Sequence, residues 1–226
     1  MKKTLAFVLA AAMMPAAFAN LLTNGDLELG TGVDDANGWT IYEGDSTGAV
    51  FNTAEIVGFA NHTPGGNRGF WFRAFMGGAS FGSTNPVDAF LFQEVAASAG
   101  QSYTLSAWFL MEQNYSGLDS NLDTTSFLAM QYLDANDQVL GFDLIDVDEV
   151  YNAQAGGWQQ FSVTGTALTG TVTMQAGADF QNGQFTRDPG QSAFVDDFHL
   201  AAVPEPATMS ALALGAMALI RRRRSR

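Results

Sequence analysis

The residues that could perform catalysis are few and lie far apart in the chain. Gly78-Ala79-Ser80-Phe81-Gly82 fits the G-x-S-x-G pattern of a nucleophile elbow, in which a strand precedes the serine and a helix follows it. Here a turn sequence follows, Ser83-Thr84-Asn85-Pro86, and the only histidine downstream is His199, inside a predicted strand. The chain has 24 glycines, so the pattern arises easily by chance. We therefore predict that the protein is not an enzyme of this type.

Thiol and zinc chemistry are also restricted. The sequence contains no cysteine, which excludes thiol catalysis, disulfides and cysteine-ligated zinc or iron–sulfur sites. His62 and His199 are the only histidines, too few for a zinc site built from histidines. Pairs of carboxylates are so frequent that they give no specific indication of glycoside hydrolysis. The acidic run from Asp143 to Glu149 lacks the spacing and the glycine of an EF-hand, and we interpret it as a solvated loop.

The charge of the chain is distributed unevenly. The formal net charge is −13, but seven of the 10 basic residues lie in the two ends. Between the ends only Arg68, Arg73 and Arg187 remain against all 23 acidic residues, which gives −20 with Glu205 counted. Such a surface repels nucleic acid and anionic membranes and attracts cations, Ca²⁺ included. We expect no nucleic-acid partner; solubility outside the cell is the simpler explanation of the same charge.

The N-terminus has the pattern of a secretion signal. Met1-Lys2-Lys3 is positively charged, the stretch from Thr4 to Met14 is apolar, and Ala17-Phe18-Ala19 fits a small-x-small cleavage site. The apolar run is too short to span a bilayer well. We predict that residues 1–19 form a signal peptide, that signal peptidase cleaves after Ala19, and that Asn20 begins the mature chain.

The C-terminus has a second targeting pattern. Val203-Pro204-Glu205-Pro206 is followed by an apolar stretch from Ala207 to Ile220 and then by a cluster of arginines: Arg221, Arg222, Arg223 and Arg224. As a helix the apolar stretch covers roughly 21 Å, short of the ~30 Å hydrocarbon core, so we predict a short C-terminal membrane helix. The arginines would hold its end in the cytoplasm, which places the middle of the chain outside.

The region between these ends, residues 20–202, has the pattern of an all-β domain. Apolar and polar residues alternate in several segments that are bounded by turn residues. The predicted strands are 70–75, 89–95, 102–110, 127–133, 158–164, 171–176 and 193–200. No interior segment has a convincing helical period, and no repeat is present. We predict a single jelly-roll β-sandwich.

The C-terminal pattern resembles the PEP-CTERM family of sorting tails, which combines Pro204-Glu205-Pro206, an apolar helix and an arginine cluster over residues 203–226. The resemblance implies recognition by exosortase, a membrane cysteine transpeptidase, and removal of the tail near the Pro-Glu-Pro motif. It also implies a Gram-negative host that makes exopolysaccharide, and transient contact with the inner membrane. An ordinary C-terminal anchor is the alternative.

The middle region resembles carbohydrate-binding modules of the galactose-binding-like jelly-roll type. The motifs occur in the family's order: Leu21-Leu22-Thr23-Asn24-Gly25-Asp26-Leu27-Glu28 as an opening strand, Gly38-Trp39-Thr40, Phe92-Gln93-Glu94-Val95 with Tyr103 to Trp108, Phe127 to Asn136, Gly157-Trp158, and Phe194 to Leu200 as the closing strand. The resemblance covers about residues 20–201 and supports the jelly-roll prediction.

This resemblance implies a structural Ca²⁺ that ties the first strand to the last. The ligands carried over are the backbone carbonyl of Asp26 and the carboxylates of Glu28 and Asp196, with a carbonyl from the loop 63–67. Ca²⁺ takes six to eight hard oxygen ligands, which suits this set. Asp196 and Asp197 point to opposite faces if the strand is regular, so only Asp196 should face the site. Surface acids at strand ends are the alternative.

The same resemblance implies that a sugar would stack on aromatic rings beside polar groups. Trp39, Trp108 and Trp158 stand at positions that pack the core in the family. Trp71 and Arg73 share a strand face and are candidate ligand-binding residues. Tyr115, with Gln113 in an acidic loop, is a third candidate.

These observations predict an exported protein, processed by exosortase, at the cell surface, in the outer envelope or in the extracellular (biofilm) matrix. Its expected role is to bind or organise extracellular polysaccharide without catalysis. Two alternatives stay open: a structural matrix or surface-layer component without a defined ligand, and a glycan-active hydrolase.

Overall fold

Two five-stranded antiparallel sheets face each other in the computed structural model, which describes residues 19–49, 52–78 and 82–204. Sheet 1 has the order β1-β4-β9-β6-β7 and sheet 2 the order β2-β3-β10-β5-β8. The strands of sheet 1 are β1 (Thr40–Asp45), β4 (Val87–Ala96), β9 (Thr173–Gly183), β6 (Thr125–Leu133) and β7 (Val139–Asp146). Those of sheet 2 are β2 (Ala54–Val57), β3 (Gly69–Arg73), β10 (Ser192–Ala202), β5 (Ser102–Met111) and β8 (Gln159–Thr166). The predicted jelly-roll β-sandwich is confirmed.

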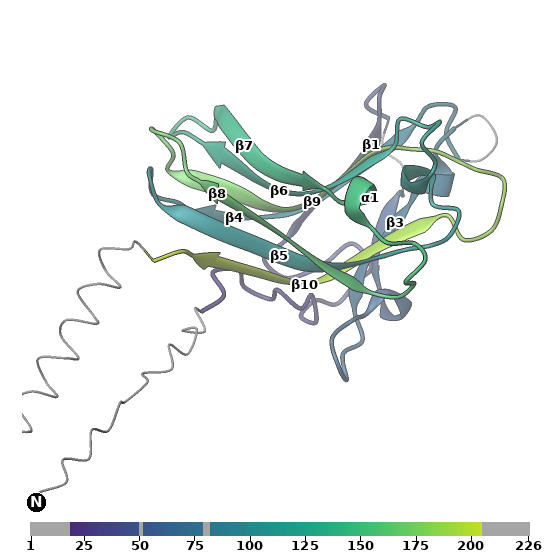
Figure 1. The fold of residues 1–226 in the computed structure, drawn as a ribbon, viewed down its shortest axis with the longest axis horizontal. Coiled ribbons are helices and arrows are strands. Elements are labelled where there is room, and N and C mark those ends of the chain that lie inside the picture. The colour runs from purple at the N-terminus through teal and green to yellow at the C-terminus, as the bar shows by residue number, and fades with distance from the viewer. Residues whose placement is uncertain (1–18, 50–51, 79–81, 205–226) are drawn as a thin grey trace, which may run out of the picture.

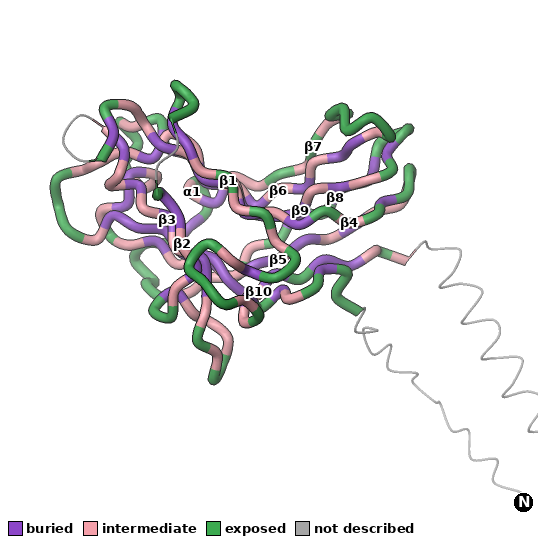
Figure 2. The backbone as a smooth tube through the Cα atoms, turned by 180° about the vertical axis from the view of Figure 1, so that it is seen from behind, coloured by how far each residue is buried: buried purple, intermediate pink, exposed green. Residues whose placement is uncertain are grey.

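Period-2 alternation puts one side of each sheet into a shared core. On β5 the buried residues alternate with half-buried ones, and Leu105, Ala107 and Phe109 are fully buried. Rings from opposite sheets meet in the middle: Phe180 of β9 lies 4.9 Å from Phe72 and 5.7 Å from Phe70, both of β3, between ring centroids. Burial of one such side chain stabilises the fold by about 1.5–3 kcal/mol. Figure 2 shows the buried segments inside both sheets and the exposed ones in the loops.

Most predicted strands are present, with bounds that differ by a few residues. The prediction missed β1, β2 and β7, which are short or lie at a sheet edge, where one-sided packing weakens the alternation. The predicted opening strand over 21–28 is not a strand. This irregular segment is fixed by its ends: the Leu21 amide donates to the Leu200 carbonyl (2.8 Å), and the buried Gln93 side chain accepts from the Thr23 amide (2.8 Å).

The acidic run from Asp143 to Glu149 is not a solvated loop, so that interpretation was wrong. Asp143 and Asp146 belong to β7, and α1 (Val147–Val150) follows directly. The Asp146 side chain accepts hydrogen bonds from the amides of Asp148 and Glu149, which caps the helix. Three short 3₁₀ turns complete the elements: η1 (Gly58–Ala60), η2 (Ala74–Met76) and η3 (Ser116–Leu118).

Both ends of the described domain leave from the same end of the sandwich (Figure 1). The Val203 amide donates to the Ser102 carbonyl at 2.8 Å, so the chain is still paired where the sorting tail begins. The cleavage residue Ala17, the residues Glu205 and Pro206, the predicted membrane helix and the arginine cluster lie outside the described residues. Within the described ranges, no helix has the length and hydropathy needed to cross a membrane.

Candidate functional site

The outer side of sheet 1 carries a row of aromatic and polar side chains around a floor of small residues. Strand register aligns Tyr42, Phe90, Asp179, Phe127 and Asp146 in one row across the sheet. The neighbouring row is Thr40, Phe92, Gly177, Ala129 and Leu144, and the next is Glu94, Gln175, Gln131 and Phe142. We call these three rows the sheet 1 face.

Aromatic rings stand at one side of this face. The rings of Phe90 and Phe92 stack with centroids 4.6 Å apart and an interplanar angle of 25°. Tyr42 lies opposite Phe90 and is 54% exposed. On the far side, on the edge strand β7, Phe142 is 63% exposed. Exposed rings of this kind offer flat apolar surfaces to a ligand.

The floor between the rings is kept low by Gly177. A Cβ added to Gly177 would lie 1.9 Å from the Leu91 carbonyl oxygen, so no side chain fits there without a backbone shift. Its neighbour in the row is Ala129, which is also small. Amide groups border this floor, since the Gln175 side chain donates to the Glu94 carboxylate at 2.8 Å next to Gln131.

A hollow of about 310 Å³ opens beside the rings, lined by Tyr42, Asp88, Ala89, Phe90, Asp179, Gln181 and Asn182. A β-bulge shapes it: the register between β4 and β9 shifts between Val87 and Ala89, and Asn182 takes a positive φ of 56°. The Asn182 amide then donates to Asp88 Oδ1 at 2.8 Å. Bulges beside binding sites re-aim side chains in this way.

The electrostatics of this hollow are acidic. The Asp179 carboxylate accepts from the Gln181 side chain at 2.6 Å, and burial raises the pKa of Asp179, with the nearby Asp88 charge acting in the same direction. None of the three arginines in the described part of the chain lines the hollow. Arg68, for example, donates to the carbonyls of Leu27 and Gly32 instead.

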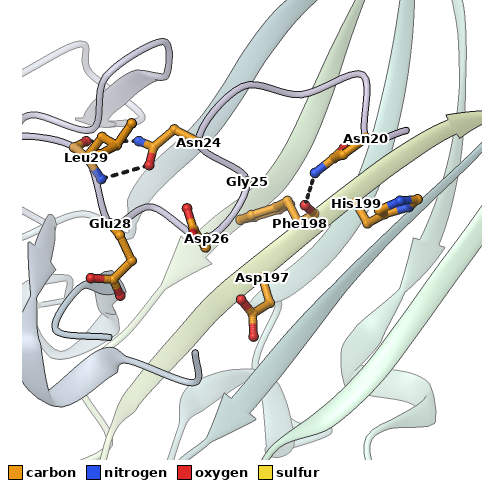
Figure 3. A pocket seen from close by; sticks show the side chains of 9 residues that line it. All are labelled: Asn20, Asn24, Gly25, Asp26, Glu28, Leu29, Asp197, Phe198 and His199. Carbon is orange, nitrogen blue, oxygen red and sulfur yellow. Dashed lines mark hydrogen bonds between the residues drawn. The ribbon is translucent and has the colours of Figure 1, made fainter. Parts of the chain in front are cut away.

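Two of the predicted calcium ligands, Asp26 and Glu28, lie in a different region, in the opening segment beside β10 (Figure 3). Asp26, Glu28 and Asp197 line an open hollow of about 580 Å³ together with Asn20 and Phe198, among others. The Asn20 side chain donates to the Phe198 carbonyl at 2.8 Å, which joins the opening segment to β10. The Asp26 side chain is exposed, and in the described residues no three acidic or histidine side chains gather closely enough to hold a metal by themselves.

Glu28 and Asp196 both contact the loop between β2 and β3. Glu28 accepts from the Asn67 amide at 2.9 and 2.8 Å, and from the Arg68 amide at 3.2 Å. Asp196 is fully buried and accepts from the His62 amide at 2.7 Å. Burial raises the pKa of Asp196 to about 7. Two acids that are distant in the sequence thus meet one loop.

The expectation that only Asp196 faces this loop was wrong. The register between β10 and β5 shifts between Asp196 and His199, and Asp197 has a positive φ of 53°. Asp197 therefore also reaches the loop, with its carboxylate 2.5 Å from His62 Nδ1 and 2.5 Å from Thr63 Oγ1. The bulge breaks the alternation on which the expectation depended.

One buried oxygen near Glu28 fits a cation site. The Asn61 Oδ1 atom is buried and has no hydrogen-bond partner among the described residues. A Cβ added to Gly66 would lie 2.1 Å from Glu28 Oε1 and 2.6 Å from Asn61 Oδ1, so both oxygens border the same glycine. Hard oxygen donors of this kind suit Ca²⁺. Sequence reasoning missed Asn61, because a single asparagine in a loop has no distinguishing pattern.

The candidate ligand-binding residues Trp71 and Arg73 are brought together on sheet 2, away from the sheet 1 face. The Arg73 guanidinium lies 4.9 Å from the Trp71 ring centroid and forms an ion pair with Glu55 at 2.9 Å. Phe59, which is 66% exposed, contacts the same ring at 4.9 Å. Arg73 is thus already engaged with protein groups.

Tyr115 is not available to a ligand, so its prediction needs correction. Its side chain is 1% exposed, and its hydroxyl pairs with Ser126 Oγ at 2.7 Å. The acidic loop that contains it folds as η3, which turns the ring into the core.

The three tryptophans that were expected in the core differ. Trp39 packs on Phe198 at 4.7 Å and donates to the Asn24 carbonyl, as a core position would. Trp108 instead stacks on His62 at 4.3 Å, and Trp158 lies 5.3 Å from the same ring. They cover the outer side of sheet 2, because β5 directs Trp108 away from the buried Phe109.

Ser80, the serine of the G-x-S-x-G pattern, lies outside the described residues. His199, the only histidine downstream of it, is an exposed residue of β10.

Comparison with known proteins identifies the C-terminal segment. Residues 202–224 match the family model of the PEP-CTERM protein-sorting motif. The chain therefore carries a PEP-CTERM sorting motif. This motif indicates an exported, surface-associated bacterial protein and implies processing by exosortase. No curated protein matches this chain in sequence.

Several solved structures are similar to the domain at low sequence identity. The enzymatically active domain of tailspike protein 4 of bacteriophage CBA120 has a TM-score of 0.53 at 11% identity, over 81% of this chain and 21% of that one. This chain thus spans about a fifth of the tailspike chain. A family 16 carbohydrate-binding module has a TM-score of 0.49 at 20% identity, over 80% of this chain and 99% of that one. The CBM22-1 xylan-binding domain of Paenibacillus barcinonensis Xyn10C has a TM-score of 0.45 at 11% identity, over 84% of this chain and 99% of that one.

Proposed function

We propose that the protein binds polysaccharide through the sheet 1 face, outside the cell, and without catalysis. The observation that carries this proposal is the floor of Gly177 and Ala129 between the stacked rings of Phe90 and Phe92 and the exposed Phe142. A sugar chain presents flat apolar faces and a rim of hydroxyl groups. The rings suit the faces, and the bordering Gln131, Gln175 and Glu94 groups suit the hydroxyls.

Export and the acidic charge of the domain favour an extracellular polysaccharide over a membrane as the binding partner. The sorting motif indicates export, and the described domain has only three basic residues, so contact with anionic lipids is unfavourable. We propose that signal peptidase releases the chain at Asn20, that the host is Gram-negative, and that exosortase removes the tail. The processed domain then acts at the cell surface or in the extracellular matrix.

We also propose a structural Ca²⁺ held by Glu28, Asp196 and the Asn61 side-chain oxygen, with the Asp26 carbonyl as the further ligand carried over from related modules. Its support is the partnerless Asn61 oxygen beside the Glu28 carboxylate. When bound, the ion would neutralise acids that the fold brings to one loop and tie the opening segment to β10. The proposed polysaccharide site lies on sheet 1, whereas Asp196 belongs to sheet 2. The ion would therefore stabilise the fold and would not contact the sugar.

A glycan panel tests the main proposal. The full chain, purified in mild detergent, is presented with soluble oligosaccharides of different classes, and binding is measured by calorimetry. Binding to one class that is weakened about fivefold in Phe90→Ala supports the proposal. Failure to bind any of them contradicts it and favours a structural matrix component, and release of shorter sugars would indicate a hydrolase.

A further inference from the structure

The hollow beside Tyr42 and Phe90 has an unusual charge for a sugar site. Two carboxylates, Asp88 and Asp179, line it together with the two rings. They belong to adjacent strands, β4 and β9, and lie close enough for the Asp88 charge to raise the pKa of Asp179. Each makes hydrogen bonds to neutral groups, Asp88 with the Asn182 amide and Asp179 with the Gln181 side chain.

No cation of the described protein balances these two acids. Lysine is absent between the two targeting ends, and none of the three arginines lines the hollow. Two like charges held side by side at a half-buried position repel each other, and the repulsion is relieved when a cation arrives. Any ligand that covers the hollow also removes water from both carboxylates, which is costly unless the ligand brings a positive charge.

The aromatic rings favour the same kind of ligand. A cation is attracted to the face of a tyrosine or phenylalanine ring, and Tyr42 and Phe90 lie opposite each other at the edge of the hollow. The combination of two rings and two carboxylates suits an ammonium group on an otherwise flat, apolar molecule. A uronic acid would be repelled, and a neutral sugar would cover the carboxylates without pairing them.

We propose that the hollow selects a sugar that carries a free ammonium group, so that the polysaccharide bound on the sheet 1 face is an amino-sugar polymer with at least some of its N-acetyl groups missing. This inference rests on the proposed function, since it specifies the ligand of the same face. The rings and the Gly177 floor hold the chain of sugars, and Asp88 and Asp179 accept hydrogen bonds from the ammonium.

Calorimetry on the full chain at about pH 6, where a sugar amine is protonated, tests the inference with three hexasaccharides: glucosamine, N-acetylglucosamine and glucose. The glucosamine hexamer is expected to bind about tenfold or more tightly than the other two, because a charge-assisted hydrogen bond forms only with the ammonium. Asp179→Asn should remove most of this preference. Asp88→Asn tests the same preference at the second carboxylate, and its side-chain oxygen can still accept the hydrogen bond from the Asn182 amide.

The domain is strongly acidic, so general attraction of a polycation needs a matched control. Asp137→Asn removes the same charge on the β6–β7 turn, at a positive φ of 58° that asparagine tolerates. It should leave glucosamine binding within about twofold of wild type. An equal loss in Asp137→Asn and Asp179→Asn would show nonspecific attraction and overturn the inference.

The other outcomes are also decisive. If the wild-type protein binds the N-acetylated or the glucose hexamer as well as the glucosamine hexamer, the amino-sugar inference is wrong while the proposed function stands. If none of a wider glycan panel binds, the proposed function itself fails. A lysine hexapeptide that binds as tightly, with the same dependence on Asp179, would replace the amino sugar by a basic peptide and overturn the inference.

Discussion

Phe92 of β4 and Gly177 of β9 are direct partners in sheet 1, so the Phe92 ring lies beside a position that has no side chain. The floor of the sheet 1 face depends on this pair, and Gly177 itself is buried. A Cβ added to Gly177 would lie 1.9 Å from the Leu91 carbonyl oxygen, which is too close for a non-bonded contact. The requirement for glycine is therefore steric and comes from a backbone atom, which cannot rotate away.

Gly177→Ala is expected to destabilise the domain by about 1–3 kcal/mol, the usual range for overpacking, and to weaken polysaccharide binding by lifting the floor. Chemical denaturation measures the first effect and calorimetry the second. Gly32→Ala is the matched control, because its added Cβ would meet only the Asp35 side chain, at 3.9 Å. Equal stability of the two variants would contradict the steric argument.

The rings of the sheet 1 face should carry binding but not folding. Phe90 is half-buried on the outer side of the sheet, so Phe90→Ala is expected to cost about 1 kcal/mol of binding, roughly fivefold in Kd. Phe59→Ala is the control, since Phe59 is an exposed ring (66%) on sheet 2. If Phe59→Ala lowers affinity and Phe90→Ala does not, the ligand binds on sheet 2, at the cluster around Trp71.

The sequence predicted the sandwich well and the sites poorly, for physical reasons. Alternation identified β5 and β6 because one side of each is buried in the core, and burial is what the pattern records. The Asp196–His199 and Val87–Ala89 bulges leave no such pattern, and they decide where Asp197 and Asp88 point. An alternation rule applied across a bulge assigns the wrong face to every residue beyond it.

The sheet 1 face was missed for a related reason. Its members come from five strands, and the sequence does not show which strands are neighbours. In the sequence, Phe90 and Phe92 have no pattern that distinguishes them from other strand residues, whereas Trp71 and Arg73 combine an aromatic ring and a rare basic residue in one strand. Only the order β1-β4-β9-β6-β7 brings Tyr42, Phe90 and Asp179 into one row.

Calcium removal should destabilise the domain. If Glu28, Asp196 and Asn61 hold Ca²⁺ in the folded state only, EGTA should lower the melting temperature. The free energy of unfolding falls by about 2.7 kcal/mol if the free calcium concentration was 100 times the Kd before EGTA was added. Glu28→Gln should abolish the calcium response, and Asp137→Asn should retain it. A melting curve that EGTA leaves unchanged would argue against the site.

Asp148 is expected to make stability depend on pH in the direction opposite to most acids. It is largely buried beside Gly117, where an added Cβ would lie 2.6 Å from its Oδ2. Burial raises the pKa of Asp148 to about 7, although Ser126 favours the ionised form. In the unfolded chain the pKa is about 3.9. Between these two values the folded state binds more protons, so this group's contribution to stability is present below about pH 4 and is lost as pH rises to 7.

Asp148→Asn removes the ionisation and keeps the shape of the side chain. Its melting temperature should match that of wild type at pH 4 and exceed it by several degrees at pH 8, where wild type holds a buried carboxylate that costs a few kcal/mol. Glu149→Gln, the exposed neighbour in α1, should show no such divergence. Thermal denaturation of the three proteins between pH 4 and 8 measures the difference. If the melting temperatures of Asp148→Asn and wild type change with pH in the same way, Asp148 ionises in the folded protein at no cost in stability.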